Sequence, residues 1–142
     1  MVDRGARHAI KLGADLSRAR VEWFNHNDAA DLLRVWESLQ SDRASHKIPF
    51  STRIWLVVEG LSENFGDVCP LPEILKMKEK YCFRVMLEES NSIGVLGRTG
   101  KGVTEHFGVP LSAVECIVGS MATSLSRWIV CDDLSFSISI LS

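Results

Sequence analysis

Phe83-Arg84-Val85-Met86-Leu87-Glu88-Glu89-Ser90-Asn91-Ser92-Ile93-Gly94-Val95-Leu96-Gly97-Arg98-Thr99-Gly100-Lys101-Gly102 is the stretch that decides the fold. Its first five residues form a mainly apolar run, which is typical of a buried strand. Two glutamates follow the run, and a glycine-rich segment comes next. Acidic groups at the carboxyl end of a strand, followed by a glycine-rich bend, are how α/β proteins build a ligand cleft. The stretch therefore predicts an α/β protein with a candidate site beside Glu88.

The rest of the chain alternates between strand and helix patterns. Apolar runs predict strands at residues 20–24, 54–58, 83–87 and 114–118, and the last three are apolar enough to be buried on both faces. Helices are predicted at 4–16, at 70–81, at 102–106 and from a cap at Asn27 or Asp28 to Leu39, with a surface loop at 40–51. This order requires right-handed crossovers. It predicts a mainly parallel sheet with flanking helices.

Bulk properties exclude several classes of function. The chain has 142 residues, which indicates one domain, and its net charge of −2 gives no nucleic-acid footprint. No apolar window of about 18 residues predicts a transmembrane segment. The four cysteines form no CxxC pair and lie in no metal-ligand spacing with histidine, so we expect reduced thiols and no metal site.

The local motifs allow more than one interpretation. Gly94, Gly97, Gly100 and Gly102 fit neither phosphate-binding glycine pattern, so tight turns with positive φ are favoured over a phosphate cradle. Glu88 and Glu89 are adjacent and should point in opposite directions, one into the cleft and the other to a loop or helix cap. The segment from His26 to Asp28 could be a site or a local helix cap.

Several separated signatures resemble the α-oxoamine synthases, pyridoxal-phosphate (PLP) enzymes of fold type I that condense an amino acid with an acyl-CoA. They are the segment 88–94, similar to Asp-Glu-x-His-Ser-x-Gly; 24–28, similar to aromatic-x-His-Asn-Asp; and 58–60 with 70–74, similar to a Glu-Gly strand end and a Pro-Leu-x-Glu-Ile helix start. Residues 78–85 are close to the first, non-catalytic subunits of serine palmitoyltransferase. The resemblance implies that residues 1–126 are the central part of a PLP-dependent transferase large domain, truncated at both ends. We expect residues 127–142 to be a divergent tail, which forms either an edge strand or a disordered stub.

The resemblance assigns three degenerate cofactor positions. Glu88 falls where the family has the aspartate that keeps the pyridine nitrogen protonated, and Asn91 falls where it has a histidine. Thr123 falls where catalytic members have the Schiff-base lysine, and no lysine follows Lys101. Because a hydroxyl cannot form an imine, we expect no catalytic residue and no PLP bound by this chain alone.

The implied role is that of a regulatory or structural subunit of serine palmitoyltransferase, which converts L-serine and palmitoyl-CoA to 3-oxosphinganine in sphingolipid synthesis. Its partner would be the catalytic second subunit, and its location the cytosolic side of the endoplasmic reticulum, or the cytoplasm if the chain exists alone. Three alternatives stay open: an independent small enzyme, an interaction module that binds the catalytic subunit without supporting activity, and a nonfunctional fragment. Because the apolar strands lack cover within the chain, we also expect marginal stability.

Overall fold

The computed structural model describes residues 1–120 and residue 123 of the chain. Its sheet has the strand order β2-β1-β3-β4-β5, and every neighbouring pair is parallel. The strands are β1 (Val2–Asp3), β2 (Trp23–Phe24), β3 (Trp55–Glu59), β4 (Arg84–Glu88) and β5 (Cys116–Val118). The predicted α/β fold with a parallel sheet is confirmed.

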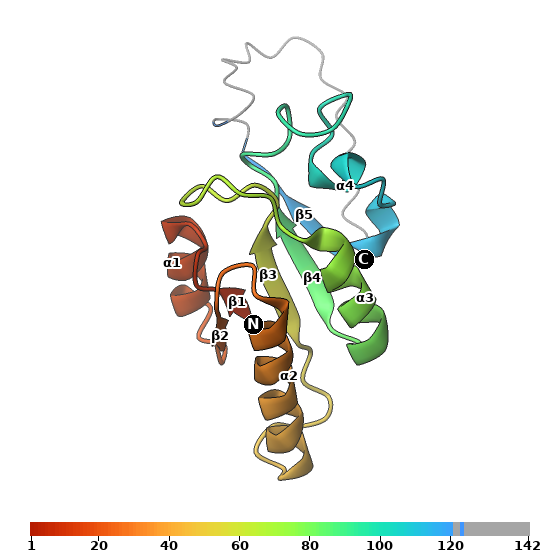
Figure 1. The fold of residues 1–142 in the computed structure, drawn as a ribbon. Coiled ribbons are helices and arrows are strands. Elements are labelled where there is room, and N and C mark those ends of the chain that lie inside the picture. The colour runs from red at the N-terminus through yellow and green to blue at the C-terminus, as the bar shows by residue number, and fades with distance from the viewer. Residues whose placement is uncertain (121–122, 124–142) are drawn as a thin grey trace.

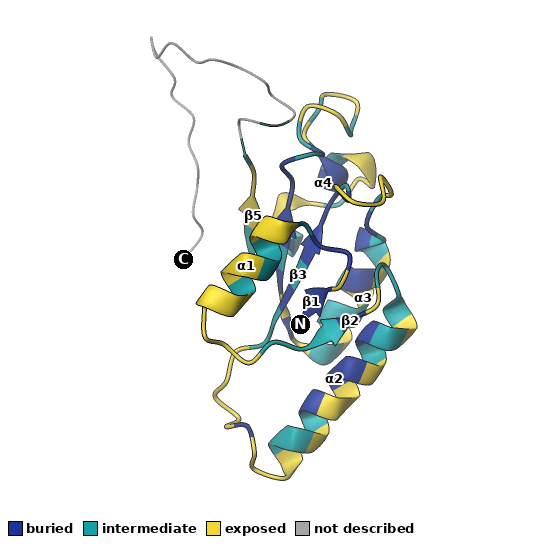
Figure 2. Ribbon diagram, turned by 90° about the vertical axis from the view of Figure 1, so that its left-hand side faces the viewer, coloured by how far each residue is buried: buried dark blue, intermediate teal, exposed yellow. Residues whose placement is uncertain are grey.

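Helices lie on both faces of this sheet, but unequally. They are α1 (His8–Leu16), α2 (Ala29–Ala44), α3 (Leu71–Tyr81), α4 (Val103–His106) and a 3-10 helix (Leu111–Ala113). In Figure 1 the sheet runs through the middle of the molecule, with α2 and α3 beside it. Figure 2 shows α1 on one side of the sheet and α2, α3 and α4 on the other. The two faces therefore have different cover.

The face under α2 and α3 carries the core. Every second residue of β3 and β4 points toward these helices, and Leu56, Val58, Val85 and Leu87 are buried there. The ring of Trp36 on α2 lies 5.7 Å from that of Phe83, measured between centroids. Burial of aliphatic and aromatic side chains of this size is the main term that stabilises the fold.

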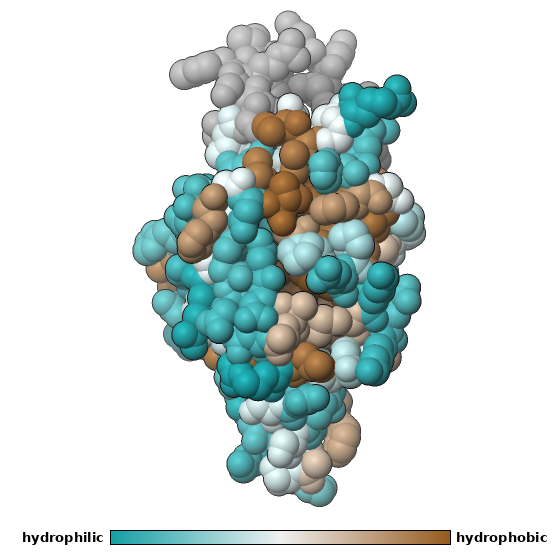
Figure 3. Space-filling model, in the orientation of Figure 1, coloured by the Kyte–Doolittle hydropathy of each residue, from teal (hydrophilic) through white to brown (hydrophobic). Residues whose placement is uncertain are grey.

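The opposite face is only partly covered. No residue of α1 is buried, and Trp55 and Val57 on β3 are half-buried. A groove of about 650 Å³ lies between α1 and the sheet, and its lining includes Ile10, Val57 and Met86. Figure 3 shows the other side of the molecule, viewed as in Figure 1, where apolar side chains reach a largely hydrophilic surface in patches. The prediction that β3 is buried on both faces is therefore wrong for the face under α1.

Three other predictions need correction. Strand β1 is absent from the predicted elements, and residues 4–7 form a turn and irregular backbone, so the helix expected from residue 4 begins at His8. Helix α2 runs to Ala44, into the predicted loop, while its predicted cap is confirmed because Asp28 accepts from the backbone N–H groups of Ala30 and Asp31. Strand β5 was expected to be buried, yet Ile117 and Val118 are exposed.

The exposure of β5 has a physical cause in its position. It pairs only with β4 and forms one edge of the sheet in the part of the chain that the structure describes.

No helix between residues 1 and 120 is long and apolar enough to cross a membrane, and the same residues contain no group of three potential metal ligands. The predicted tail, residues 127–142, lies outside the described residues.

Candidate functional site at the carboxyl end of the sheet

Glu88 ends β4 and is almost fully buried. Its Oε1 accepts a hydrogen bond from the backbone N–H of Ser90 at 3.1 Å and another from the Ser90 hydroxyl. Its Oε2 is buried and has no hydrogen-bond partner among the described residues. A buried carboxylate oxygen without a partner is costly, so this atom marks a place where a polar group could bind.

Arg7, the residue that precedes α1, lies over the same strand ends. Its Nη1 is 3.6 Å from Glu88 Oε1, and its Nε is 2.9 Å from Glu63 Oε2. Its backbone N–H donates to Glu59 Oε1 at 3.2 Å. Burial raises the pKa of Glu59, and the neighbouring charge of Glu88 raises it further. Arg7 thus offsets the repulsion between two carboxylates that face each other in the register of β3 and β4.

Asn91 and Thr123 complete the predicted trio, and both lie beside Ser90. The side-chain Nδ2 of Asn91 is buried and lacks a hydrogen-bond partner within residues 1–120 and 123. The hydroxyl of Thr123 donates to the carbonyl of Ser90 at 2.5 Å. Ser90 Oγ in turn accepts from the backbone N–H of Ser120 at 2.8 Å. The three positions that the resemblance assigned to the cofactor therefore all lie next to Ser90, and their role as cofactor positions stays a prediction.

Glu89 points away from this site, as predicted for adjacent residues at a strand end. Its two carboxylate oxygens accept from the backbone N–H of Val103, at 3.2 and 3.1 Å, and Oε2 also accepts from the Ser92 hydroxyl. Burial raises the pKa of Glu89, although these hydrogen bonds lower it in part. Glu89 therefore serves the first residue of α4 as a capping carboxylate, a structural role.

The glycine-rich segment is a set of tight turns, as predicted. Gly94, Gly97, Gly100 and Gly102 all have φ between 77° and 91°. The Glu105 carboxylate fastens the segment because it accepts from the Thr99 N–H at 2.9 Å and from the Thr99 hydroxyl at 2.7 Å. The segment therefore forms tight turns that are fastened to the following helix α4, the interpretation favoured over a phosphate cradle.

The segment at residues 26–28 does more than cap a helix. His26 lies between two carboxylates, with Nδ1 3.0 Å from both oxygens of Asp3 and Nε2 2.9 Å from Asp67 Oδ1. Asn27 donates from Nδ2 to Asp67 Oδ2 at 3.0 Å. The sequence signalled these residues only through the aromatic-x-His-Asn-Asp signature, because both aspartates are distant along the chain.

The donor set decides what the site can hold. Glu88 Oε2 can accept a hydrogen bond and Asn91 Nδ2 can donate one, so polar contacts to a ring such as that of PLP are possible. Thr123 offers a hydroxyl that is already bonded to the backbone and cannot form an imine. The Arg7 guanidinium lies 3.6 Å from Glu88 Oε1, so it would compete with a bound ring for the charge of this carboxylate. The residues present do not fit covalent attachment of PLP.

Known proteins that this chain resembles include serine palmitoyltransferases. No protein-family model matches the chain. It is 46% identical over 126 residues to serine palmitoyltransferase 1 of Dictyostelium discoideum, covering 89% of this chain and 26% of that protein. It is 42% identical over 127 residues to long chain base biosynthesis protein 1c of Oryza sativa subsp. japonica, with the same coverage of 89% and 26%.

The solved structures agree on the fold. A structure of SPT (serine palmitoyltransferase) with PLP as the internal aldimine superposes with a TM-score of 0.72 and 26% identity, over 87% of this chain and 29% of that one. The chain thus spans about a quarter of the length of the curated relatives that it matches, 26% in both cases given.

Proposed function

We propose that this chain, a relative of serine palmitoyltransferase 1 and long chain base biosynthesis protein 1, contributes a non-catalytic part of serine palmitoyltransferase. The relationship confirms the resemblance inferred from the sequence motifs. In this proposal a catalytic second subunit supplies the Schiff-base lysine and condenses L-serine with palmitoyl-CoA to 3-oxosphinganine. The chain supplies Glu88 and Asn91 to a site that the two subunits share.

The hydrogen bonding of Thr123, Glu88 and Asn91 supports a non-catalytic role. Where a lysine would be needed, Thr123 bonds its hydroxyl to the carbonyl of Ser90. In the same site, Glu88 Oε2 and Asn91 Nδ2 are buried without hydrogen-bond partners among the described residues. A site that keeps unsatisfied polar atoms but has no group for covalent chemistry is expected of a subunit that supports a reaction carried out by another chain.

The exposed edge of the sheet favours a second candidate function. Ile117 and Val118 are 38% and 43% exposed, and Val118 lies opposite Glu88 in the register of β4 and β5. Among the described residues β5 pairs only with β4, and a strand edge of this kind with apolar side chains is a surface on which another chain can dock. The chain could therefore bind the catalytic subunit without supporting its activity.

Co-expression of the tagged chain with the catalytic second subunit separates these functions. We expect the partner to be recovered with the tag, and the complex to form 3-oxosphinganine in a serine-dependent assay. Recovery with product below that of the catalytic subunit alone would favour the interaction module. A soluble chain that recovers no partner would refute both functions and favour a nonfunctional fragment.

Two variants locate the contact. Val118→Asp places a charge at the exposed sheet edge, and we expect it to reduce recovery of the catalytic subunit. Leu16→Asp is the matched control, because Leu16 is 72% exposed on α1. Equal recovery for both variants would exclude the β5 edge as the contact.

We propose the cytosolic side of the endoplasmic reticulum as the location of the complex, and the cytoplasm for the chain by itself. The proposal follows from the relationship alone. Fractionation of cells that express the tagged chain with and without the catalytic subunit would test it. A chain that stays in the soluble fraction while bound to the catalytic subunit would contradict it.

A further inference from the structure

The loop between β3 and α3, residues 61–68, lies at the carboxyl edge of the sheet. An antiparallel bridge between Leu61 and Val68 closes it, and the backbone N–H of Ser62 donates to the carbonyl of Asp67 at 2.9 Å. The loop is therefore a small unit of its own. Its position relative to the sheet depends on contacts that it makes with other segments.

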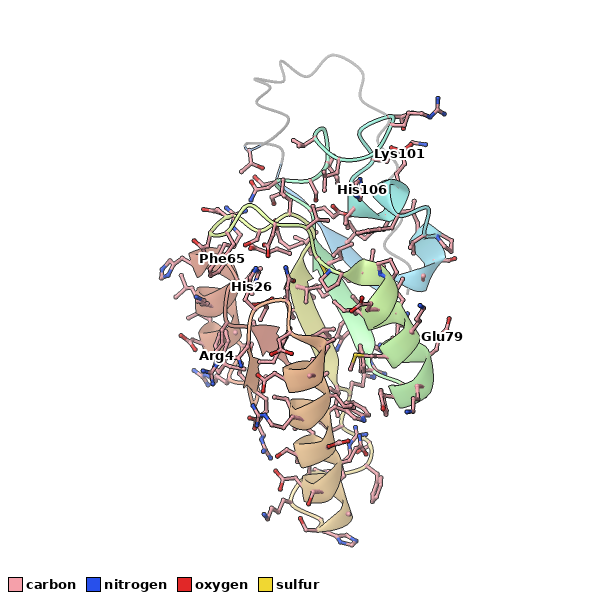
Figure 4. All side chains as sticks on the ribbon, viewed as in Figure 1. Arg4, His26, Phe65, Glu79, Lys101 and His106 are labelled. Carbon is pink, nitrogen blue, oxygen red and sulfur yellow. The ribbon has the colours of Figure 1, made fainter. Side chains whose placement is uncertain are left out.

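Two of those contacts involve the imidazole of His26. The imidazole lies between Asp3 at the end of β1 and Asp67 on the loop, at distances of 3.0 and 2.9 Å. The ring of Phe65 stacks on it, with centroids 4.3 Å apart and an angle of 19° between the planes. Figure 4 shows His26 and Phe65 next to each other, well separated from Lys101 and His106.

The backbone at Gly5 lies very close to the imidazole ring of His26. A Cβ at Gly5 would lie 2.3 Å from His26 Nδ1 and 2.9 Å from the Phe65 ring, so this close approach needs glycine. The backbone N–H of Gly5 also donates to Asp3 Oδ1 at 2.6 Å. This hydrogen bond holds the Asp3 carboxylate beside the His26 ring.

The loop also reaches the candidate site. Asn64 Nδ2 donates to the carbonyl of Gly5 at 2.9 Å, and Glu63 pairs with Arg7 at 2.9 Å. Arg7 extends to Glu88 Oε1 at 3.6 Å. A displacement of the loop would therefore move the guanidinium that accompanies Glu88.

The two carboxylates favour a charged imidazole, although Asn27 Nδ2 also lies 3.4 Å from His26 Nε2. A neutral histidine has one N–H and one acceptor nitrogen, so it can donate to Asp3 or to Asp67, and the other nitrogen would then face a carboxylate oxygen. An imidazolium donates to both. The charged groups that act on His26 are Asp3 and Asp67, and burial lowers its pKa, but the hydrogen bonds to these two carboxylates outweigh burial and raise the pKa. Cys69 interacts with the same two aspartates and is neutral, because burial raises the pKa of its thiol.

We propose that His26 is a positioning residue that clamps loop 61–68 to β1 through its bonds to Asp3 and Asp67, and that loss of its proton releases the loop. Release would carry Glu63 away and loosen Arg7 from Glu88. The proposal concerns contacts inside this chain and does not depend on the proposed function.

The test is chymotrypsin cleavage after Phe65, in the purified full chain, as a function of pH. Cleavage after Phe50 is the internal reference, because Phe50 is 72% exposed and Phe65 is 63% exposed. We expect the Phe65-to-Phe50 cleavage ratio to rise as pH increases through the raised pKa of His26. The total rise should be about tenfold for each pKa unit by which the clamped loop raises the pKa of His26 above its value with the loop released. An NMR titration of the imidazole measures the pKa in the same sample.

Three variants complete the experiment. His26→Gln should give a high ratio at every pH, and His8→Gln, on an exposed histidine of α1, should behave as the parent chain. Asp67→Asn keeps a hydrogen-bond acceptor but removes one charge, so it should lower the pKa of His26 and shift the transition to lower pH. A ratio in the parent chain that does not change with pH would overturn the proposal. An unchanged pKa of His26 in Asp67→Asn would overturn it as well, even if His26→Gln fails to fold.

Discussion

Replacing Gly102 with alanine tests the close contact between the glycine-rich segment and the Glu89 carboxylate. Gly102 has φ +91° and ψ −161°, a region that is essentially restricted to glycine. An added Cβ would lie 2.6 Å from Glu89 Oε2 and 2.9 Å from both Glu89 Cδ and Oε1. The substitution therefore strains the backbone and displaces the carboxylate that caps α4.

The size of the effect follows from these two contributions. Backbone strain of this kind costs about 1–3 kcal/mol. Loss of the charge-assisted hydrogen bonds from Val103 and Ser92 to Glu89 adds about 1.5–3 kcal/mol. The sum, about 2.5–6 kcal/mol, is a large part of the roughly 5–15 kcal/mol that stabilises a typical domain.

Gly108→Ala is the matched control. Gly108 also has a positive φ, +65°, but among the described residues no atom beyond its own chain neighbours lies within 4 Å of the position that a Cβ would take. It should cost only the strain of a left-handed residue, about 1–2 kcal/mol. Urea unfolding followed by tryptophan fluorescence measures both variants. Equal shifts in the unfolding midpoint would refute the argument that the Glu89 carboxylate makes Gly102 necessary.

Three further predictions concern stability. Because folding raises the pKa of Glu89, the folded state favours its protonated form; the free energy of unfolding should fall as pH rises from the ordinary glutamate pKa of 4.5 through the raised one, and Glu89→Gln should weaken this dependence in urea unfolding at several pH values, leaving the part that Glu59 contributes. Asp28→Ala should destabilise the chain by about 1 kcal/mol and Asp28→Asn by much less, because asparagine caps a helix equally well; similar losses for both would contradict the capping role. With Ile117 and Val118 exposed and α1 covering little, the chain by itself should melt over a broad range and bind the dye ANS; a sharp, cooperative melt in calorimetry would show that the uncovered face costs little.

Much of the candidate site could be predicted because its residues are consecutive. Glu88 and Glu89 follow a strand, so alternation places their side chains on opposite sides, as the structure has them. The capping role of Asp28 is equally local. Such features depend on a few neighbouring residues, and the sequence contains all of them.

Other features depend on partners that are distant in sequence. Nothing near His26 indicates that Asp3 and Asp67 will lie on either side of its ring. The reach of Arg7 to Glu88 is likewise set by how α1 lies over the sheet. These contacts form only when separate segments come together, so a local pattern does not contain them.

The prediction that β5 is buried was wrong for a different reason. The apolar residues of β5 indicate what these side chains prefer, and their exposure shows that the described chain does not supply the cover. Strand β1 is two residues long, too short for any periodicity to detect. The division of the chain at residues 126 and 127 stays a prediction.

The most direct test of a shared site is the activity of the complex with Asn91→Ala. Asn91 Nδ2 is buried and has no hydrogen-bond partner in the described part of the chain, so in the proposed complex it would bond to the cofactor or substrate. Loss of a buried hydrogen bond of about 1–2 kcal/mol should lower 3-oxosphinganine formation about tenfold, with the catalytic subunit still recovered. Asn25→Ala, at an exposed position, is the control and should leave product formation unchanged. Equal product from the Asn91→Ala complex and the parent complex would contradict the claim that this chain contributes to the site.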